Sequence, residues 1–215
     1  MQAVIFDLDG LMINSEDLSL KAWRGVLAPY GKSIADSDYH AMIGLDSPAT
    51  SRRVIELTSV PLAGEVLANA HWRQLLDIID RELEPMPGLL ALIQEITDRN
   101  YPLAIASNSP SDYVERALKA IGVRNTFRCV VGRDKVTRGK PAPDVYLAAA
   151  ACLGAAPEHC LAFEDSPIGM RAALAAGMRC VVVPNEHLNG ADFGGAHGCY
   201  KSLVELRGAL GSWLV

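Results

Sequence analysis

Short apolar runs alternate with amphipathic stretches along most of the chain. Five runs are almost continuously apolar, as in strands that are buried on both faces of a sheet: residues 3–6, 103–107, 129–132, 160–163 and 180–183. Helical patterns that end at a glycine lie between them, at residues 112–121, 144–153 and 168–176. This order of strands and helices predicts an α/β fold with a doubly wound parallel sheet.

One long segment interrupts the alternation. Between residues 15 and 84 no run has the pattern of a strand, and amphipathic helical patterns occur at 18–27, 51–57 and 65–79. The segment ends at "EPMPG", where prolines and a glycine precede the next helical pattern. We therefore predict an α/β core built from residues 1–14 and 85–215. An inserted α-helical cap domain at 15–84 is expected to form a lid over the carboxyl end of the first strand.

The composition narrows the possible functions. Half of the 215 residues are hydrophobic, and the net charge of −5 indicates no basic surface for nucleic acid. No apolar run approaches the roughly 20 residues that span a bilayer, and the start of the chain lacks the pattern of a signal peptide. The five cysteines show no CxxC spacing. We expect reduced cysteines in a cytoplasmic protein that binds neither nucleic acid nor membrane.

Two aspartates follow the first apolar run, in "VIFDLDG". In extended backbone Asp7 and Asp9 face the same way. Carboxylates about 4 Å apart repel by on the order of 4 kcal/mol at an effective dielectric near 20. The pair persists if a cation neutralises it or if one acid holds a proton, and Mg²⁺ suits carboxylate oxygens. The alternative is a surface turn whose aspartates cap the next element.

Polar side chains also follow the second run, in "LAIASNSP". Ser107 and Asn108 stand at the strand's tip, and Ser109 is expected to be the N-cap of a helix with Pro110 in its first turn. Hydroxyl, amide and free N–H groups at a helix start can form an anion cradle. An ordinary capped helix is the alternative.

The later strands end in a similar way. The fourth run leads into "LAFEDSPIGM", with Glu164 and Asp165 before an expected N-cap at Ser166. Between these strands "TRGKPAPD" places Lys140 on a proline-stiffened loop, where it can act as a point charge on phosphate or aspartate. Acids near a helix start can also simply complement its dipole. Because the carboxyl ends of parallel strands share one edge, we interpret these loops as one catalytic set.

The stretches "FDLDG", "ASNS", "GKPAPD" and "FEDSPIGMRAALAAGM" together resemble the haloacid dehalogenase (HAD) superfamily, in its phosphatase and phosphoglucomutase-like branch. The resemblance extends from residue 3 to about residue 184. It implies a Rossmann-like core whose helical cap shuts over the active site, and a monomer.

The resemblance also implies roles for individual residues. Asp7 would be the nucleophile that becomes an aspartyl-phosphate, and Asp9 the acid and base. Ser107 and Asn108 would hold the phosphoryl oxygens, and Lys140 would offset the charge on the phosphate and on Asp7.

A Mg²⁺ site is implied as well. Its ligands would be Asp7, the backbone carbonyl of Asp9, and Asp165, with Glu164 nearby.

Substrate contacts are implied less directly. The "GLMINSE" run resembles the "GLLIDSE" of sugar-phosphate phosphatases, with Asn14 in place of an acid. Asn14 and Glu16 are therefore expected near the cap hinge and the substrate, and Gly44 and Leu45 in the specificity loop of the cap. The expected partner is a small phosphorylated metabolite, with a sugar phosphate as the first candidate.

Two other functions compete with phosphate ester hydrolysis. In β-phosphoglucomutase a histidine follows the first motif and a cap arginine binds the second phosphate, whereas the matching positions here are Ser19 and Ser47. Arg52 or Arg53 could substitute for that arginine. A phosphoacceptor or binding domain of another class is disfavoured, because its phosphorylated aspartate stands on a middle strand and it has no 70-residue insert.

Overall fold

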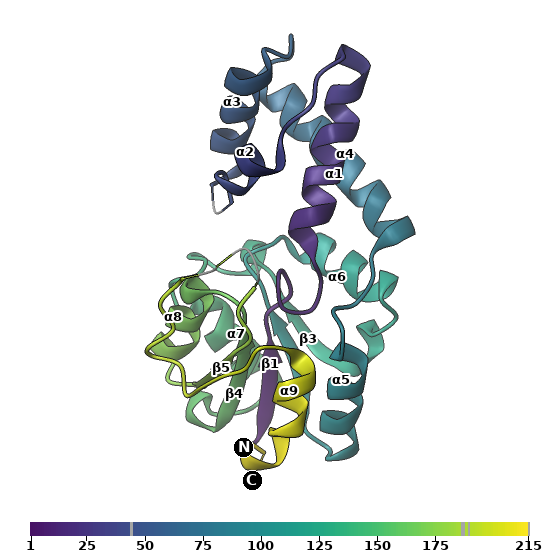
Figure 1. Cartoon of the computed structure of the whole chain (residues 1–215). Helices are drawn as coiled ribbons and strands as arrows, with labels where there is room; N and C mark the ends of the chain where they lie inside the picture. Colours follow the sequence, from purple (N-terminus) through teal and green to yellow (C-terminus); the bar gives the residue numbers. More distant parts are fainter. Residues whose placement is uncertain (44, 186–187, 189, 215) are drawn as a thin grey trace. The chain divides into compact units, whose positions relative to one another are not determined.

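The structure is a computed structural model that describes residues 1–43, 45–185, 188 and 190–214. The chain forms two compact units, which are drawn together in Figure 1. One unit comprises Met1–Asn14 and Glu84–Val215, and the other comprises Ser15–Leu83. Glu84 thus belongs to the α/β unit, one residue earlier than the boundary expected from the sequence.

The α/β unit contains a six-stranded sheet in the order β3-β2-β1-β4-β5-β6, in which every pair of neighbouring strands is parallel. The strands are β1 (Ala3–Phe6), β2 (Leu103–Ala106), β3 (Phe127–Val131), β4 (Cys160–Glu164), β5 (Arg179–Val182) and β6 (Gly198–Cys199). The doubly wound parallel sheet that the sequence predicts is confirmed. Of the strands in the described residues, β6 alone was not predicted, because two residues at the edge of a sheet leave no apolar run.

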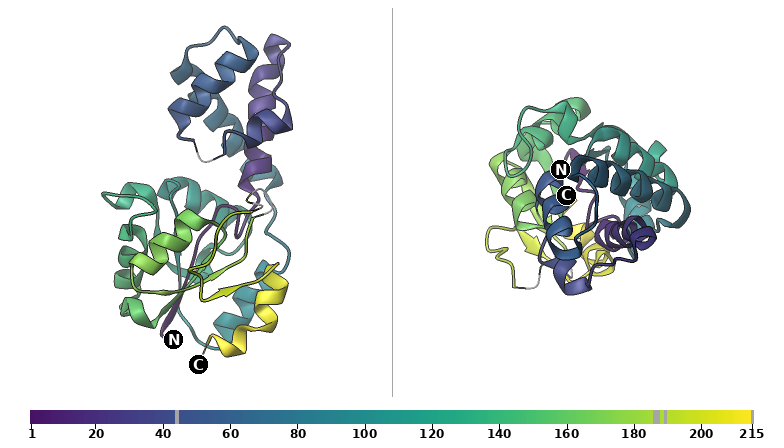
Figure 2. Two further views of the ribbon diagram at one scale, coloured as in Figure 1. Left: turned by 60° about the vertical axis from the view of Figure 1, so that its left-hand side comes forward. Right: turned by 90° about the horizontal axis from the view of Figure 1, so that it is seen from above.

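Helices cover both faces of this sheet, as Figures 1 and 2 show. They are α5 (Leu89–Asp98), α6 (Ser111–Ala120), α7 (Asp144–Leu153), α8 (Pro167–Ala175) and α9 (Leu203–Gly208). Every residue of β1, β2 and β4 is buried. Burial on both faces explains why these strands are apolar throughout instead of alternating.

The order of the strands reverses beside β1. The chain adds β2 and β3 on one side of β1 and then returns to place β4 on its other side. In the register of β1 and β4, Phe6 lies opposite Phe163, and their rings meet edge to face at 5.0 Å. The next residue of each strand is an acid, Asp7 and Glu164. The sheet therefore brings both acids to the switch point, where open α/β sheets bind their ligands.

The second unit is wholly helical. It contains α1 (Ser15–Leu27), α2 (Asp36–His40), α3 (Ser47–Thr58) and α4 (Gly64–Glu82) around an apolar core of its own. Trp23 is only 3% exposed in that core and stacks on His71 with ring centroids 4.0 Å apart. The five-residue α2 was not predicted. The role of this unit as a cap stays a prediction.

Two helix starts were predicted from Ser-Pro pairs, and one prediction was wrong. Ser166 caps α8, since its side chain accepts a hydrogen bond from the N–H of Gly169 at 3.1 Å. Ser109 does not cap α6, which begins at Ser111 after Pro110. Instead Asp134, 23 residues further on, accepts from both the N–H and the hydroxyl of Ser111 at 2.7 Å. A cap from another loop is invisible in the local sequence.

The cysteine prediction is also corrected. Cys129 on β3 and Cys152 at the end of α7 form a disulfide, although 23 residues separate them. The packing of α7 against β3 brings them together, and no short-range spacing signals this. Cys160 and Cys180 are free and buried, and Cys199 is free and exposed. Among the helices of the described residues, none combines the length and the apolar character needed to cross a bilayer.

Candidate active site

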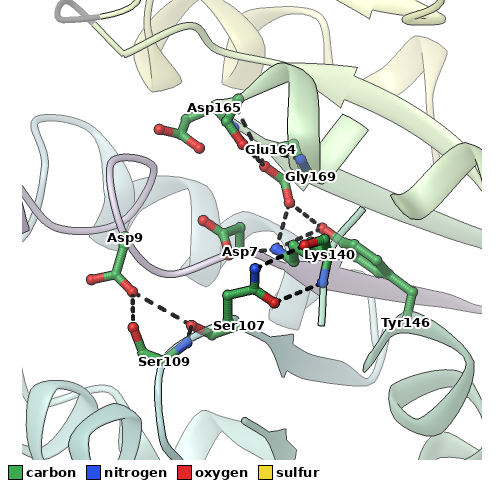
Figure 3. Close-up of polar contacts among 11 residues, drawn as sticks. Asp7, Asp9, Ser107, Ser109, Lys140, Tyr146, Glu164, Asp165 and Gly169 are labelled. Atoms are coloured by element: carbon green, nitrogen blue, oxygen red, sulfur yellow. Dashed lines mark hydrogen bonds and ion pairs between the residues drawn. The ribbon is translucent and has the colours of Figure 1, made fainter. Parts of the chain in front are cut away.

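Asp7 lies at the carboxyl end of β1 and is only 7% exposed. Its backbone N–H continues the sheet by donating to the carbonyl of Phe163 at 2.9 Å. Its side chain therefore starts from a rigid position. The Nζ of Lys140 donates to its Oδ1 at 2.6 Å (Figure 3). A nearly fully buried carboxylate thus has one oxygen fixed by a cation.

Lys140 bridges two buried acids. Its Nζ also donates to Oε1 of Glu164 at 2.5 Å, and the side chain of Lys140 is only 4% exposed. The hydroxyl of Tyr146 donates to the same Oε1 at 2.7 Å, and the lysine Nζ lies 4.9 Å from the centre of the tyrosine ring. Burial by itself would lower the pKa of Lys140, but Asp7 and Glu164 outweigh burial and raise it. Lys140 is therefore charged at neutral pH.

The other oxygen of Glu164 is bound by the start of α8. Its Oε2 accepts from the N–H of Asp165 at 3.1 Å and from the hydroxyl of Ser166 at 3.3 Å. Gly169, one turn into α8, lies directly against this carboxylate. A Cβ at that position would come within 1.8 Å of Oε1. Glycine is therefore required there for the acid to hold its place.

Three buried acids converge on one point. Asp7, Glu164 and Asp165 each offer an oxygen within 4.8 Å of the others. The backbone of Gly10 passes close by in the left-handed region, with φ at 81°, and a Cβ there would lie 2.0 Å from Oδ2 of Asp165. The glycine of "DLDG" thus leaves room for this acid beside the first motif.

The electrostatics of the cluster favour a cation. Burial raises the pKa of Asp7 to about 8; Lys140 opposes the shift, and Glu164 and Asp9 add to it. Burial, followed by Asp7 and Glu164, raises the pKa of Asp165 well above its usual range. A divalent cation would relieve this repulsion, and carboxylate oxygens are the ligands that Mg²⁺ prefers. The donor set fits Mg²⁺.

The carboxylate of Asp9 is directed elsewhere. It is turned towards the start of α6, as Figure 3 shows for its contact with Ser109. The Ser109 hydroxyl donates to its Oδ2 at 2.7 Å, and the Tyr113 hydroxyl donates to its Oδ1 at 3.0 Å. The Ser107 hydroxyl is a longer third donor, at 3.4 Å from Oδ2. The two aspartates of the first motif thus occupy different environments.

Ser107 and Asn108 lie beside this site but differ in what they offer. Ser107 is 1% exposed at the tip of β2, with its hydroxyl between Asp9 and the backbone. The amide of Asn108 is occupied by the peptide groups of Lys140. It accepts from the lysine N–H at 2.7 Å and donates to the lysine carbonyl at 3.2 Å. The Asn108 side chain therefore fixes the lysine loop.

The expected substrate residues are divided between the two units. Asn14 belongs to the α/β unit. Glu16 belongs to the helical unit, where its Oε2 accepts from the hydroxyl of Tyr39 at 2.6 Å. Leu45 is 49% exposed in the same unit, and Gly44 lies outside the described residues.

The positions that bear on the mutase alternative also lie in the helical unit. The hydroxyl of Ser19 is 3.1 Å from Nε2 of His71. Ser47 is the first residue of α3. Arg53 is exposed and pairs with Glu56 at 3.0 Å.

Several residues of the site were missed from the sequence. Tyr146, fully buried, is the only aromatic residue in the α7 sequence "DVYLAAAACL". A tyrosine in such a largely apolar helix indicates that its buried hydroxyl has a polar partner. Ser109 lies in the loop before α6 and Tyr113 lies in the first turn of that helix, so no helical spacing relates the two side chains. Their shared partner Asp9 is about 100 residues away and could not be inferred.

A parallel sheet with buried acids after β1 and β4, joined by a buried lysine, is typical of hydrolases with the haloacid dehalogenase fold. The family of haloacid dehalogenase-like hydrolases matches residues 4–183, and the chain belongs to this family. The resemblance noted in the sequence is thereby confirmed.

Named relatives agree with this assignment. The fructose-1-phosphate phosphatase YqaB of Escherichia coli (strain K12) is 37% identical over 183 residues, covering 84% of this chain and 95% of that protein. A probable pseudouridine-5'-phosphatase of Drosophila melanogaster is 35% identical, covering 86% of this chain and 82% of that protein. The crystal structure of a putative β-phosphoglucomutase from Thermotoga maritima superposes with a TM-score of 0.89 at 26% identity, covering 99% of each chain.

Proposed function

We propose that this protein is a Mg²⁺-dependent phosphatase that hydrolyses a small phosphate monoester through an aspartyl-phosphate on Asp7. The observation that supports this most directly is the placement of Asp7. It is buried at the switch point of the sheet, and Lys140 holds its Oδ1 at 2.6 Å. That contact orients the carboxylate, and in the proposed reaction Oδ2 is the attacking oxygen.

In the first step Oδ2 of Asp7 forms a bond to phosphorus as the bond to the leaving oxygen breaks. Asp9 gives its proton to that oxygen, so the product leaves as an alcohol. Splitting the reaction in two suits phosphate monoesters, which are among the slowest substrates to hydrolyse without a catalyst. Lys140 and the hydroxyl of Ser107 counter the negative charge on the phosphoryl oxygens.

In the second step a water molecule gives a proton to Asp9 and attacks the phosphorus of the aspartyl-phosphate. The bond between phosphorus and Asp7 breaks, which releases inorganic phosphate and restores the carboxylate. A positioned acid and base of this kind typically contributes a factor of about 10²–10⁴ to each proton-transfer step.

Asp7 and Asp165, together with the backbone carbonyl of Asp9, would hold the Mg²⁺. Glu164 is close enough to be a further ligand, although both of its oxygens already accept hydrogen bonds. When bound, the ion supplies positive charge where two anions, the aspartate and the phosphate, must meet.

The substrate class is proposed from the relatives. Two of them are named as phosphatases of small phosphorylated compounds, and this chain is likewise a phosphoric monoester hydrolase. We propose a sugar phosphate as the substrate. Residues 15–83 would act as the cap that selects it. Asn14, Glu16, Gly44 and Leu45 would contribute contacts.

The similarity to a putative β-phosphoglucomutase makes phosphoryl transfer between sugar hydroxyls the second candidate. Ser19 and Ser47 disfavour it, because they stand where the mutase resemblance requires a histidine and an arginine. Incubation with a sugar 1-phosphate and glucose 1,6-bisphosphate separates the two activities. A mutase would interconvert isomers without releasing phosphate, whereas we expect net phosphate release.

Asp7→Asn tests the proposed function. We expect Mg²⁺-dependent phosphate release from para-nitrophenyl phosphate, and from a panel of sugar phosphates, to fall below detection in this variant. Its unfolding midpoint should match or exceed that of the wild type, because the substitution removes a buried acid. Asp98→Asn, an exposed acid at the end of α5, is the matched control and should keep full activity. Near-normal turnover by Asp7→Asn would exclude Asp7 as the nucleophile.

A further inference from the structure

The carboxylate of Asp9 is held by residues that the proposed reaction does not yet use. Ser109 binds its Oδ2 at 2.7 Å and Tyr113 binds its Oδ1 at 3.0 Å. Both donors belong to the loop and first turn of α6. Together they bind both oxygens of a group that must deliver a proton to the leaving alcohol.

These two donors are rigidly placed. Tyr113 is only 3% exposed within α6. The carbonyl of Ser109 accepts from the N–H of Arg133 at 3.0 Å, and the backbone of Gly132 lies so close that a Cβ there would be 2.7 Å from that carbonyl oxygen. The hydroxyls of Ser109 and Tyr113 therefore form a rigid binding site for the Asp9 carboxylate, which we call the seat.

Ser107 links this seat to the phosphoryl site. Its hydroxyl accepts from the N–H of Ser109 at 2.9 Å and donates towards Oδ2 of Asp9 at 3.4 Å. A serine hydroxyl has a single proton to donate. It cannot donate to Asp9 and to a phosphoryl oxygen at the same time. Seating of Asp9 and binding of phosphate therefore compete for one hydrogen bond.

We propose that Ser109 and Tyr113 are positioning residues that hold Asp9 in a resting position. A bound phosphoryl group takes over the hydroxyl of Ser107, which removes one donor from the resting position and lets Asp9, carrying its proton, turn towards the leaving oxygen. This inference rests on the proposed function. It ties delivery of the acid to the presence of substrate.

The proposal predicts that loosening the seat strengthens phosphate binding. A ligand that binds only one of two states has its affinity reduced by the fraction of protein in that state. Tyr113→Phe removes one hydrogen bond from the resting position and leaves the ring. We expect the Kd for inorganic phosphate to fall by about three- to tenfold, the range given by the net strength of one hydrogen bond.

The measurement is isothermal titration of the full chain with inorganic phosphate in the presence of Mg²⁺. Tyr200→Phe is the matched control, because its hydroxyl accepts from Nε1 of Trp213 at 2.8 Å, in the C-terminal part of the chain. The control should leave the Kd unchanged. An unchanged or weaker Kd in Tyr113→Phe overturns the proposal, and a weaker one would assign Tyr113 to direct contact with phosphate.

A double-mutant cycle separates seating from general loosening of the fold. In an Asp9→Ala background there is no carboxylate to seat, so adding Tyr113→Phe should leave the Kd for phosphate unchanged. A further gain in that background would show that the tyrosine acts by another route and would refute the inference.

A crystal structure of the wild type with phosphate provides a test that needs no variant. We expect Asp9 to have left Ser109 and Tyr113 while Ser107 donates to the phosphate. If Asp9 stays in the seat beside bound phosphate, this inference is overturned but the proposed function is not. A wild type that neither binds phosphate nor releases it from para-nitrophenyl phosphate would overturn the proposed function as well.

Discussion

The substitution Gly169→Ala tests the packing of the buried acid cluster. Helix propensity and the contact with Glu164 predict changes in the stability of the protein that have opposite signs. Gly169 lies inside α8, where alanine is intrinsically favoured over glycine by about 1 kcal/mol. Helix propensity alone therefore predicts a more stable protein. The contact with Glu164 predicts a less stable one.

The contact distances determine the expected magnitude. The new Cβ would lie 1.8 Å from Oε1 and 2.1 Å from Oε2 of Glu164, so the carboxylate must move by more than about 1.2 Å to reach the 3.0 Å that real contacts require. Such a shift breaks the hydrogen bonds from Lys140 at 2.5 Å and Tyr146 at 2.7 Å. Overpacking costs about 1–3 kcal/mol, and a hydrogen bond to a charged group contributes about 1.5–3 kcal/mol. After the gain in propensity, we expect a net loss of at least about 3 kcal/mol, the lower end of the sum of these contributions.

Urea unfolding followed by circular dichroism measures this loss. For a chain of this size a loss of about 3 kcal/mol already corresponds to a decrease in Tm of roughly 6–12 °C. Gly208→Ala on α9 is the control, because a Cβ there meets no atom within 4 Å among the described residues, and it should be neutral or slightly stabilising. A Gly169→Ala protein as stable as the wild type would refute the account of the Glu164 pocket.

Two further predictions concern pH. Mg²⁺ should raise the Tm more at pH 8.5 than at pH 6, because burial raises the pKa of Asp7 to about 8 and protons compete with the ion below that pH. A Mg²⁺-induced shift in Tm that is the same at both values would contradict this. Burial lowers the pKa of His71 to about 4 from 6.5, so its neutral form stabilises the fold above pH 6.5 and that stabilisation is lost as the pH falls towards 4. Between pH 7 and pH 5 the wild type should lose about 1–2 kcal/mol more than His71→Gln, and an imidazole that titrates near 6.5 by NMR would exclude this.

Local patterns determined most of the fold. The buried strands could be recognised because each must be apolar on both faces, and α7 was predicted with the residues it has, 144–153, because a glycine ends it at Gly154. The Ser166 cap of α8 was equally predictable, since the residue and its partner Gly169 are three positions apart. Each of these features depends on neighbours within one turn or one strand.

The site could be predicted in outline for a topological reason. Parallel strands bring their carboxyl ends to one edge, so the loops that follow β1, β2, β3 and β4 must gather there whatever the details of packing. This is why Asp7 and Lys140, 133 positions apart, could be expected together and are found 2.6 Å apart. The resemblance of the motifs to a known family added their roles.

Tertiary packing decided which atoms meet. Asn108 stays a predicted phosphoryl contact, and its amide also binds the backbone of Lys140, a partner that the local sequence does not indicate. Ser109 was expected to cap a helix, but its hydroxyl binds Asp9. The disulfide between Cys129 and Cys152 follows from the docking of α7 on β3. A short polar side chain has several partners within reach, and only long-range packing selects one. The sequence therefore determined which groups assemble at the sheet edge, and the folded structure determined how their hydrogen bonds are shared.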